Sequence, residues 1–331
     1  MTGTGPDWRP GVSAQRLRQR ALSLATARQF FIARGMVEIE TPTIIACPVS
    51  DPQLANIPCR LASQPGTDFF LHTSPEYHMK RALAAGSGDI FQISKVFRDG
   101  EQGPRHLPEF TLAEWYRCGV GYQDFIAETV DFVRSIGKSL GTELPPVQQL
   151  AYSEVCRAYA DVDPLTAPTH ELAAAARRLL GAETTSALEV SLGADRDAWL
   201  DLLVVSAVEP GLADAGFVVV DRYPASQAAL ARLDANDPRV AERFEIYLHG
   251  LELANGYHEL SDAGEQARRF AADLQRRTSL GRPTVPIDEE LLAALAAGLP
   301  DCCGVALGLD RLLMACLGET DIRRVVAFTA A

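Results

Sequence analysis

The sequence lacks the features of an exported, membrane-spanning or disulfide-stabilised protein. No stretch approaches the roughly eighteen uninterrupted apolar residues of a membrane span, and the first dozen residues contain no apolar core of signal-peptide length. The seven cysteines form no C-x-x-C pair, and no histidine lies near them at metal-ligand spacing. These absences are typical of a cytoplasmic protein with reduced, mostly buried thiols.

Positive charge is also scarce. The 331 residues carry 43 acidic and 31 basic side chains, a net charge of −12, and no run of lysines or arginines forms an arm for nucleic acid. Arginines at positions 16, 18, 20, 28 and 34 gather on or near one predicted helix, and we interpret them as a solvated helix face. The composition argues against tight, generic binding of nucleic acid.

Two common nucleotide-binding motifs are missing as well. No G-x-x-x-x-G-K-[ST] loop occurs, and no G-x-G-x-x-G follows a predicted strand. The chain is nonetheless ordinary globular material, with 47% hydrophobic and 22% charged residues. Because no change of composition marks a linker, we expect a tail over residues 1–12 and one domain over residues 13–331.

Among the residues present, the segment 97–117, FRDGEQGPRHLPEFTLAEWYR, is the richest in chemical groups. It is predicted to form two strands joined by a polar loop. Arg98 lies at a strand end, from which its guanidinium can take a phosphate oxygen bidentately. Phe110 opens the return strand and offers a flat face for a base. Taken alone, the segment is also consistent with a β-hairpin that carries solvated charges.

A second segment, GVALGLDR at 304–311, strengthens the nucleotide interpretation. Gly304, Ala306 and Gly308 alternate with larger apolar residues, which suits a strand whose one face must admit a close approach to its backbone. Asp310 is predicted to start a helix, with Arg311 in its first turn. A packing explanation would be preferred for this segment in isolation.

A third region, RFEIYLHGLELANGYHEL at 243–260, is predicted to form a hairpin that turns at His249 and Gly250. Glu245 and Glu252 would then approach each other across an antiparallel pair, where two carboxylates beside a triphosphate would suit magnesium. Two exposed glutamates on a hairpin remain the alternative.

Periodicity and capping residues predict an α+β protein, a mainly antiparallel sheet flanked by helices. Helices are expected at 13–34, within 73–86, at 122–140, 261–278 and 287–298, and through the alanine-rich stretch 150–215. Pro42 lies in the middle of a predicted strand over 36–45. Because proline cannot donate to a central ladder, this strand is expected at a sheet edge or a subunit contact.

Three of these segments together resemble motifs 1, 2 and 3 of class II aminoacyl-tRNA synthetases: TPT at 41–43, the whole of 97–117, and GVALGLDRLLM at 304–314. Within that superfamily SPEYHMKR, EFTLAEWY and ELANGYHEL resemble the lysyl-tRNA synthetase catalytic domain. The likeness begins near residue 13, so no OB-type anticodon-binding domain is expected before it. The chain is therefore most similar to the truncated lysyl-tRNA synthetase paralogues, the elongation factor P lysine lysyltransferases.

The resemblance implies roles for individual residues. Arg98 and Arg311 would be catalytic. ATP would be bound by Arg98, Glu101, His106, Phe110, Glu245, Glu252, Gly308 and Arg311, and Mg²⁺ by Glu245 and Glu252. The pocket for lysine or β-lysine would be lined by Ser74, Glu76, Glu114, Tyr116, Asn255, Tyr257, Glu259 and Ala306.

Two positions distinguish this chain within the resemblance. Ala306 stands where lysyl-tRNA synthetases have glycine, and its methyl group would favour (R)-β-lysine over α-lysine by roughly 1–3 kcal/mol. The chain reads FRDGE where the family usually reads F-R-N-E-E or F-R-N-E-G. Gly100 thus replaces a glutamate expected to contact adenine, and Glu101 is its candidate substitute.

The implied function is that of an ATP-dependent ligase. It would activate (R)-β-lysine or lysine as an aminoacyl adenylate and transfer it to a lysine side chain of elongation factor P. Transfer to tRNA or a carrier protein is one alternative, with tRNA disfavoured by the acidic charge. An inactive synthetase-like regulator is another. Motif 1 implies a homodimer, and no membrane partner is expected.

Overall fold

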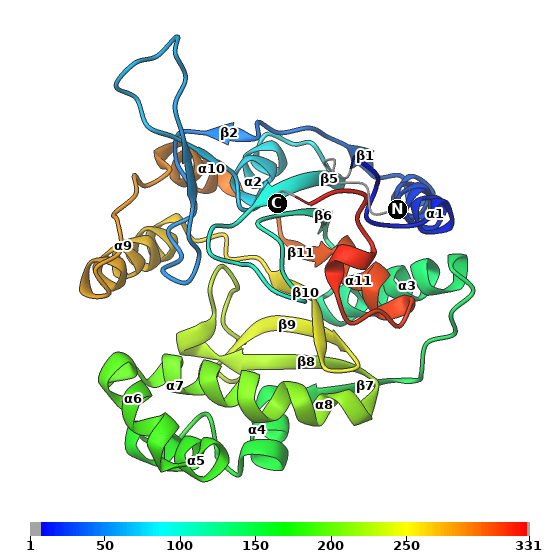
Figure 1. Ribbon diagram of the computed structural model, residues 1–331. Coiled ribbons are helices and arrows are strands. Elements are labelled where there is room, and N and C mark those ends of the chain that lie inside the picture. The colour runs from blue at the N-terminus through cyan, green and yellow to red at the C-terminus, as the bar shows by residue number, and fades with distance from the viewer. Residues whose placement is uncertain (1–7, 330–331) are drawn as a thin grey trace.

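An eight-stranded sheet forms the centre of the computed structural model, which describes residues 8–329 (Figure 1). The six inner strands pair antiparallel, and only the two edge strands pair parallel. In spatial order the strands are β1 (Val37–Glu38), β5 (Ile90–Phe97), β6 (Glu109–Cys118), β11 (Cys302–Gly308), β10 (Leu251–His258), β9 (Val240–Leu248), β8 (Phe217–Pro224) and β7 (Val147–Ala151). The expected α+β architecture, mainly antiparallel with flanking helices, is confirmed.

The predicted strand around Pro42 was wrong in its extent. It is two short strands, β1 and β2 (Ile44–Ile45), with Pro42 in the connection between them. β2 belongs to a separate three-stranded sheet of order β2-β4-β3, with β3 at Ile57–Cys59 and β4 at Phe69–Leu71. Both β1 and β2 lie at sheet edges, as proline nearby requires, and the chain crosses from one sheet to the other at the proline.

One face of the large sheet is covered by α1 (Ala14–Ile32), α3 (Tyr122–Ser139) and α11 (Leu309–Cys316), which enclose the main apolar core. The ring of Phe31 lies 4.6 Å from that of Phe91, 5.0 Å from Trp115 and 5.0 Å from Phe132. Aromatic contacts at these distances add to the stability that burial supplies. This core holds the sheet rigid behind the strands that carry the chemical groups.

A second group of helices packs around α2 (Glu76–Ala84) near the small sheet. These are α9 (Ala263–Ser279) and α10 (Glu289–Gly298), whose N-caps Asp262 and Asp288 each accept a backbone N–H hydrogen bond. Pro75 is the N-cap residue of α2, and the Ser74 hydroxyl accepts a hydrogen bond from the Glu76 N–H. Glu76 is thereby fixed in the first turn.

The expected helical stretch forms a separate layer against β7 and β8, seen at the bottom of Figure 1. It packs on its own apolar cluster around Trp199 and Tyr152. Its helices are α4 (Tyr152–Ala160), α5 (Thr169–Leu180), α6 (Ala182–Leu192), α7 (Arg196–Leu203) and α8 (Glu209–Ala215), with a π-helical turn at Val204–Val208. Two 3₁₀ turns, Ala225–Gln227 and Ile322–Arg324, complete the regular elements.

The interpretation of these arginines as a solvated helix face is wrong for Arg16 and Arg20, which are partly buried, whereas Arg18 is exposed. Arg20 donates to Asp310, a carboxylate that is 1% exposed, and to the Thr111 hydroxyl. Arg16 pairs with Glu319 and Arg34 with Glu128. Arg16 and Arg20 thus tie α1 to the C-terminal part of the chain, whereas Arg34 lies just after the helix.

All seven cysteines are free thiols, four of them buried, as expected. Among the helices of residues 8–329, none combines the length and the hydropathy that crossing a bilayer demands. Residues 1–7 of the predicted tail lie outside the described residues.

Candidate active site

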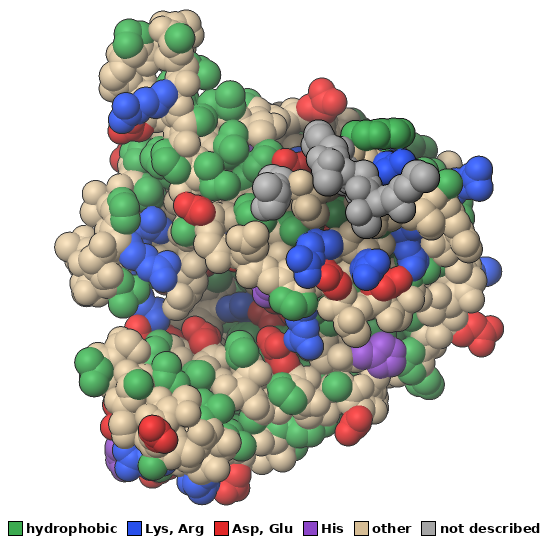
Figure 2. Space-filling view, in the orientation of Figure 1, with side chains coloured by type: hydrophobic (Ala, Val, Ile, Leu, Met, Phe, Trp, Pro, Cys, Tyr) green, Lys and Arg blue, Asp and Glu red, His purple; other side chains and the backbone are tan. Residues whose placement is uncertain are grey.

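A cavity of about 790 Å³ opens between the central sheet, the loop 49–54 and the helical layer. Figure 2 shows its mouth as a hollow above the helical layer, with acidic and basic side chains around it. The sixteen residues predicted for ATP and amino acid all line this one cavity: Ser74, Glu76, Arg98, Glu101, His106, Phe110, Glu114, Tyr116, Glu245, Glu252, Asn255, Tyr257, Glu259, Ala306, Gly308 and Arg311.

Strand register brings together groups that are far apart in the sequence. β11 pairs with β6 on one side and β10 on the other, so Ala306 lies opposite both Glu114 and Asn255. Gly304 lies opposite both Tyr116 and Tyr257. Because side chains alternate between the faces of a strand, these residues share the face that lines the cavity.

Gly304 is required by its neighbours. A Cβ atom there would lie 2.3 Å from the Tyr116 ring and 2.4 Å from Glu259 Oε1, closer than atoms can approach. Gly308, four residues on, has no atom within 3.8 Å of the corresponding position. The strand was expected to admit a close approach to its backbone. At Gly304 the approaching groups belong to the protein, whereas Gly308 leaves the space open.

Carboxylates gather at the closed end of the cavity. Glu114 is 1% exposed; its Oε2 accepts from the Ser74 hydroxyl at 2.7 Å and its Oε1 from the Tyr116 hydroxyl at 2.8 Å. Burial, and then the nearby charge of Glu76, raise the pKa of the Glu114 carboxyl to about 8. In the empty cavity this group therefore holds a proton at neutral pH.

A buried lysine, which the sequence analysis did not single out, lies behind two of these carboxylates. Lys80 is 2% exposed, and its Nζ lies 2.7 Å from Glu76 Oε1 and 2.6 Å from Glu259 Oε2. Burial would lower the pKa of the Lys80 ammonium, but the two carboxylates outweigh it and raise that pKa above its usual value. Two of the three glutamates expected in the amino-acid pocket, Glu76 and Glu259, therefore already contact a cation of the protein itself.

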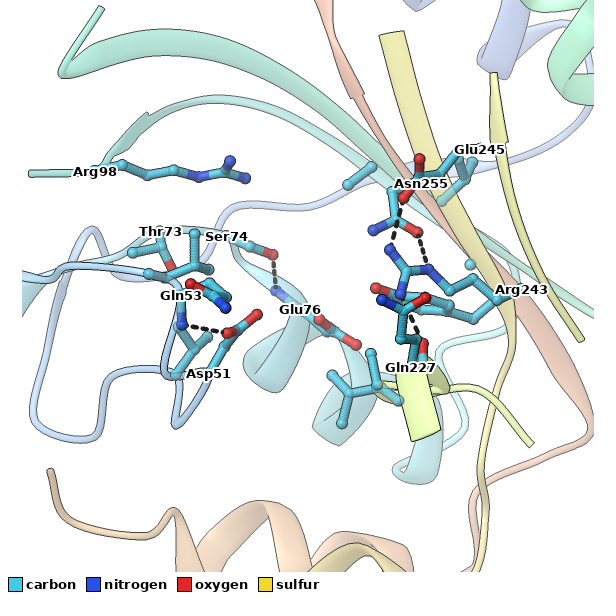
Figure 3. Close-up of a pocket in the computed structure, with 18 of the residues that line it drawn as sticks. Asp51, Gln53, Thr73, Ser74, Glu76, Arg98, Gln227, Arg243, Glu245 and Asn255 are labelled. Carbon is cyan, nitrogen blue, oxygen red and sulfur yellow. Dashed lines mark hydrogen bonds and ion pairs between the residues drawn. The ribbon is translucent and has the colours of Figure 1, made fainter. Parts of the chain in front are cut away.

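Arginines occupy the open part of the cavity. Figure 3 shows Arg98 extending from the end of β5 across the space above Thr73 and Ser74. Its guanidinium carbon lies 5.1 Å from the centre of the Phe110 ring, and its nearest carboxylate is Glu101 at 3.6 Å. The buried Arg98 Nε has no hydrogen-bond partner. Because this N–H is unpaired, the planar guanidinium of Arg98 can donate hydrogen bonds to an anion that enters the cavity.

Arg311 lies across the cavity on the first turn of α11, as predicted. It donates to the Glu252 carbonyl at 3.0 Å, to the Glu252 carboxylate at 3.3 Å and to His106 Nε2 at 2.6 Å. Burial, followed by the Arg311 charge, lowers the pKa of His106. The arginine thus joins the polar loop of the β5–β6 hairpin to the β9–β10 hairpin.

The two predicted magnesium ligands do not face each other directly. The hairpin turns at His249 and Gly250 as expected, but the register pairs Glu245 with Asn255 and Glu252 with Tyr247. The turn causes this offset, because it pairs Leu248 with Leu251 and so places Glu252 diagonally from Glu245; the bulge between residues 252 and 254 shifts only the pairing beyond it. Both carboxylates still line the cavity, and burial followed by the charge of Glu245 raises the pKa of Glu252.

Arg243 is a further residue that the sequence analysis missed. Its guanidinium donates to Glu245 at 2.6 Å, to the Gln227 carbonyl at 2.6 Å and to Asn255 Oδ1 at 3.3 Å (Figure 3). Arg243 lies two residues before Glu245 on the same strand. Because side chains alternate between the two faces of a strand, this spacing could have predicted that Arg243 faces the cavity together with Glu245. Arg243 therefore orients Glu245.

The unusual loop after Arg98 has a defined structure. Gly100 has a φ of +73°, a conformation that glycine adopts without strain, and its N–H donates to Asp99 Oδ1. Leu107 is buried in the main core, and the Pro104 carbonyl accepts from the Ile322 N–H at 2.7 Å. The replacement of the family's asparagine and glutamate by Asp99 and Gly100 therefore forms a tight turn.

Comparison with known proteins agrees with this geometry. Residues 6–331 match the family model of the class II tRNA synthetases (D, K and N). The chain belongs to this family. It is also 42% identical over 325 residues to proteins named elongation factor P–(R)-β-lysine ligase from Salmonella dublin, Salmonella paratyphi B and Salmonella heidelberg, covering 97% of this chain and 97% of each relative.

The family match confirms the resemblance to class II synthetases that the three motifs indicated. The similarity to the elongation factor P ligases confirms the branch within that family. The motif segments form the strands and the helix expected for them: β5 and β6 for the second, β11 and α11 for the third. The roles of individual residues remain predictions that rest on the geometry of the cavity.

Proposed function

We propose that this chain is an ATP-dependent ligase that activates (R)-β-lysine, or lysine, and transfers it to a lysine side chain of elongation factor P. The observation that carries the proposal is the division of one cavity into two ends. Buried carboxylates suited to ammonium groups lie at the closed end, and Arg98 and Arg311, suited to phosphates, lie at the other. The shared name of the relatives supports the acceptor.

The chemistry has two steps. A carboxylate oxygen of the amino acid attacks the α-phosphorus of ATP, which forms the aminoacyl adenylate and releases pyrophosphate. The neutral amine of the acceptor lysine then attacks the adenylate carbonyl, an amide bond forms, AMP leaves and the amine loses a proton. Arg98 would hold the amino-acid carboxylate and the α-phosphate in line, and this positioning is the main contribution of the site.

The remaining groups would hold ATP. Phe110 offers its ring to adenine, Glu101 and His106 lie beside the nucleotide end, and Arg311 would meet the γ-phosphate. Gly308 leaves its backbone open to a close approach. At the other end Tyr257 and Asn255 would complete the amino-acid pocket with Glu76, Glu114 and Glu259, while the Ala306 methyl would favour the β-amino acid.

Glu245 and Glu252 would hold Mg²⁺ with the phosphates of ATP. Each lines the cavity and keeps acceptor capacity beyond its contacts with Arg243, Tyr247 and Arg311, so the pair fits a cation that takes one or two carboxylates and substrate oxygens. When bound, the metal would neutralise phosphate charge. Within residues 8–329 no three or more acidic, cysteine or histidine side chains form a metal cluster of their own.

Amino-acid-dependent pyrophosphate exchange tests the activation step. A panel of α-lysine, both β-lysine enantiomers and ornithine should give the fastest exchange with (R)-β-lysine. Arg98→Ala should abolish exchange, whereas Arg60→Ala, in an exposed ion pair with Asp68, serves as the matched control. Background exchange with every amino acid would overturn the proposal in favour of an inactive regulator, and charging of tRNA would reassign the acceptor.

We also propose that the chain is a homodimer in the cytoplasm, where its acceptor would be found. Leu22 and Ile32 of α1, Val37 of β1 and Ile44 of β2 are 47%, 54%, 54% and 42% exposed. These apolar side chains lie on the first helix and on the two short strands on either side of the TPT segment of motif 1, where a second copy would bury them. A monomeric mass in sedimentation equilibrium would contradict this assignment.

A further inference from the structure

The carboxylates at the closed end of the cavity share an internal counterion. Lys80 follows Glu76 by one helical turn on α2, so both side chains project from the same helix face. Glu259 follows β10 and reaches the same ammonium from the sheet. Lys80 does not line the cavity itself; it lies behind Glu76 and Glu259, which do.

Glu259 is left with unused acceptor capacity by this arrangement. It is 4% exposed, and while its Oε2 faces the Lys80 ammonium, its Oε1 is buried and accepts no hydrogen bond. A buried carboxylate oxygen without a donor is costly unless a cation meets it. The orphaned oxygen therefore marks the place of an ammonium group supplied by a ligand.

The charges then balance for one class of ligand. Three carboxylates, Glu76, Glu114 and Glu259, against one ammonium, Lys80, leave two negative charges when all are ionised. A diamino acid brings two ammonium groups, and its carboxylate belongs with Arg98 at the other end. Without Lys80, two adjacent buried carboxylates would share a proton and close on each other, because like charges at this distance do not both ionise.

We propose that Lys80 is a positioning residue that holds the carboxyl groups of Glu76 and Glu259 in place and apart, so that the pocket selects substrates with two ammonium groups. This inference rests on the proposed function, since it concerns the amino acid that is activated. The other titratable groups that face the cluster are Glu114 and Tyr116 of β6, Tyr257 of β10 and Cys302 of β11. Burial raises the pKa values of the two tyrosines and the cysteine above their usual range. Burial also raises the pKa values of the Glu114 and Glu259 carboxyls to about 8, and the Lys80 charge opposes the rise at Glu259.

The test compares Lys80→Met, Lys80→Arg and the control Lys95→Met, which removes a half-exposed lysine on β5. Pyrophosphate exchange is measured from pH 6.5 to 9.5 with (R)-β-lysine and with 6-aminohexanoate, which has one ammonium group. We expect Lys80→Met to raise the KM for the diamino acid about tenfold or more at pH 7 and to leave the KM for ATP within about twofold of wild type. The KM of this variant for the diamino acid should return toward the wild-type value as pH rises. The variant should also prefer (R)-β-lysine over 6-aminohexanoate less strongly than the wild type does, while Lys80→Arg and Lys95→Met stay near wild type in all these values.

Recovery at high pH separates the proposal from a merely structural role, because raising the pH would ionise the shared carboxyl but would not repair a misfolded variant. A pH-independent loss that affects ATP equally, or no loss at all, would overturn it. Inactivity of the wild type with every diamino acid would instead overturn the proposed function.

A measurement on the wild-type protein keeps the inference testable if Lys80→Met does not fold. Titration calorimetry with (R)-β-lysine at pH 7, in buffers of different ionisation enthalpy, counts the protons released on binding. Burial raises the pKa values of both Glu114 and Glu259 to about 8, and Lys80 opposes the rise at Glu259, so the count should lie between about one and two. A count near three would show that all three carboxyls bind a proton before the ligand arrives and would overturn the role of Lys80.

Discussion

The Arg311 guanidinium donates to His106 Nε2 across 2.6 Å. Arginine has no acceptor, so His106 must accept through Nε2 and carry its proton on Nδ1. The lowered pKa of His106 is consistent with this neutral form. One arginine on α11 thus holds the polar loop of motif 2 over the nucleotide end of the cavity.

We predict that Arg311→Lys weakens ATP binding selectively. A lysine cannot donate in three directions from one plane, and each charge-assisted hydrogen bond contributes about 1.5–3 kcal/mol. The KM for ATP should rise about tenfold to hundredfold, with the KM for the amino acid little changed. Exchange kinetics measure both, with Arg324→Lys on the exposed last turn as control. Equal effects on both substrates would argue against the phosphate role.

The affinity for the amino acid should rise with pH up to about 8. Burial and Glu76 hold the pKa of Glu114 at about 8, so below that pH the carboxyl is protonated and offers no charge to an ammonium group. Glu114→Gln should make this pH profile shallower and raise KM at pH 8.5, with the remaining pH dependence due to Glu259, whose pKa is also about 8. Glu109→Gln, exposed at the start of the same strand, should leave the profile intact. A wild-type affinity independent of pH between 6.5 and 8.5 would contradict the assignment.

The Glu114 carboxyl also makes the stability of the protein depend on pH, but in the opposite direction: stability should fall with rising pH, whereas affinity should rise. Between the ordinary pKa of a glutamate, about 4.5, and about 8, the folded protein keeps a proton that the unfolded chain has lost. The free energy of unfolding of the substrate-free protein should therefore fall through this window as pH rises. Bound diamino acid, which favours the ionised carboxylate, should oppose that fall in thermal-unfolding measurements.

Two glycines of β11 should respond differently to alanine. Gly304→Ala places a methyl group against Tyr116 and Glu259, and it should lower the free energy of unfolding by about 1–3 kcal/mol and disrupt amino-acid binding. Gly308→Ala meets no atom closer than 3.8 Å, so its stability should be near wild type. If Gly308 admits ATP, its substitution should raise the KM for ATP alone. Denaturant unfolding and exchange kinetics distinguish the two, and equal stability of both variants would contradict the packing argument.

Ala306→Gly should weaken the preference for (R)-β-lysine. The methyl group lies on the cavity face between Glu114 and Asn255. One methyl group contributes about 1–3 kcal/mol to discrimination, so the ratio of kcat/KM for (R)-β-lysine to that for α-lysine should fall about tenfold or more. An unchanged ratio in competitive exchange assays would remove Ala306 from the specificity determinants.

The sequence predicted the elements that depend on local signals. Periodicity and caps located α1, α3, α9 and α10, and the motif resemblance placed all the chosen residues in one cavity. The register was predicted wrongly although the turn was located correctly, because a turn at His249 and Gly250 pairs Leu248 with Leu251 and thereby places Glu252 opposite Tyr247.

Long-range partnerships were missed for a different reason. Lys80 appeared only as part of a helix, and nothing in its neighbourhood reveals that Glu259 pairs with it from almost 180 positions away. The pairing of Arg20 with Asp310 was hidden in the same way. Buried ion pairs of this kind are settled by tertiary packing, because each partner alone has the pattern of a surface residue.

The transfer step is the central claim, and the intact mass of elongation factor P tests it most directly. The factor is incubated with this protein, ATP and (R)-β-lysine, and the modified residue is located by peptide sequencing. We predict a mass gain of one β-lysyl group on a single lysine, dependent on ATP and absent with Arg98→Ala. An unmodified factor, under conditions in which the wild-type protein carries out rapid pyrophosphate exchange, would contradict the account.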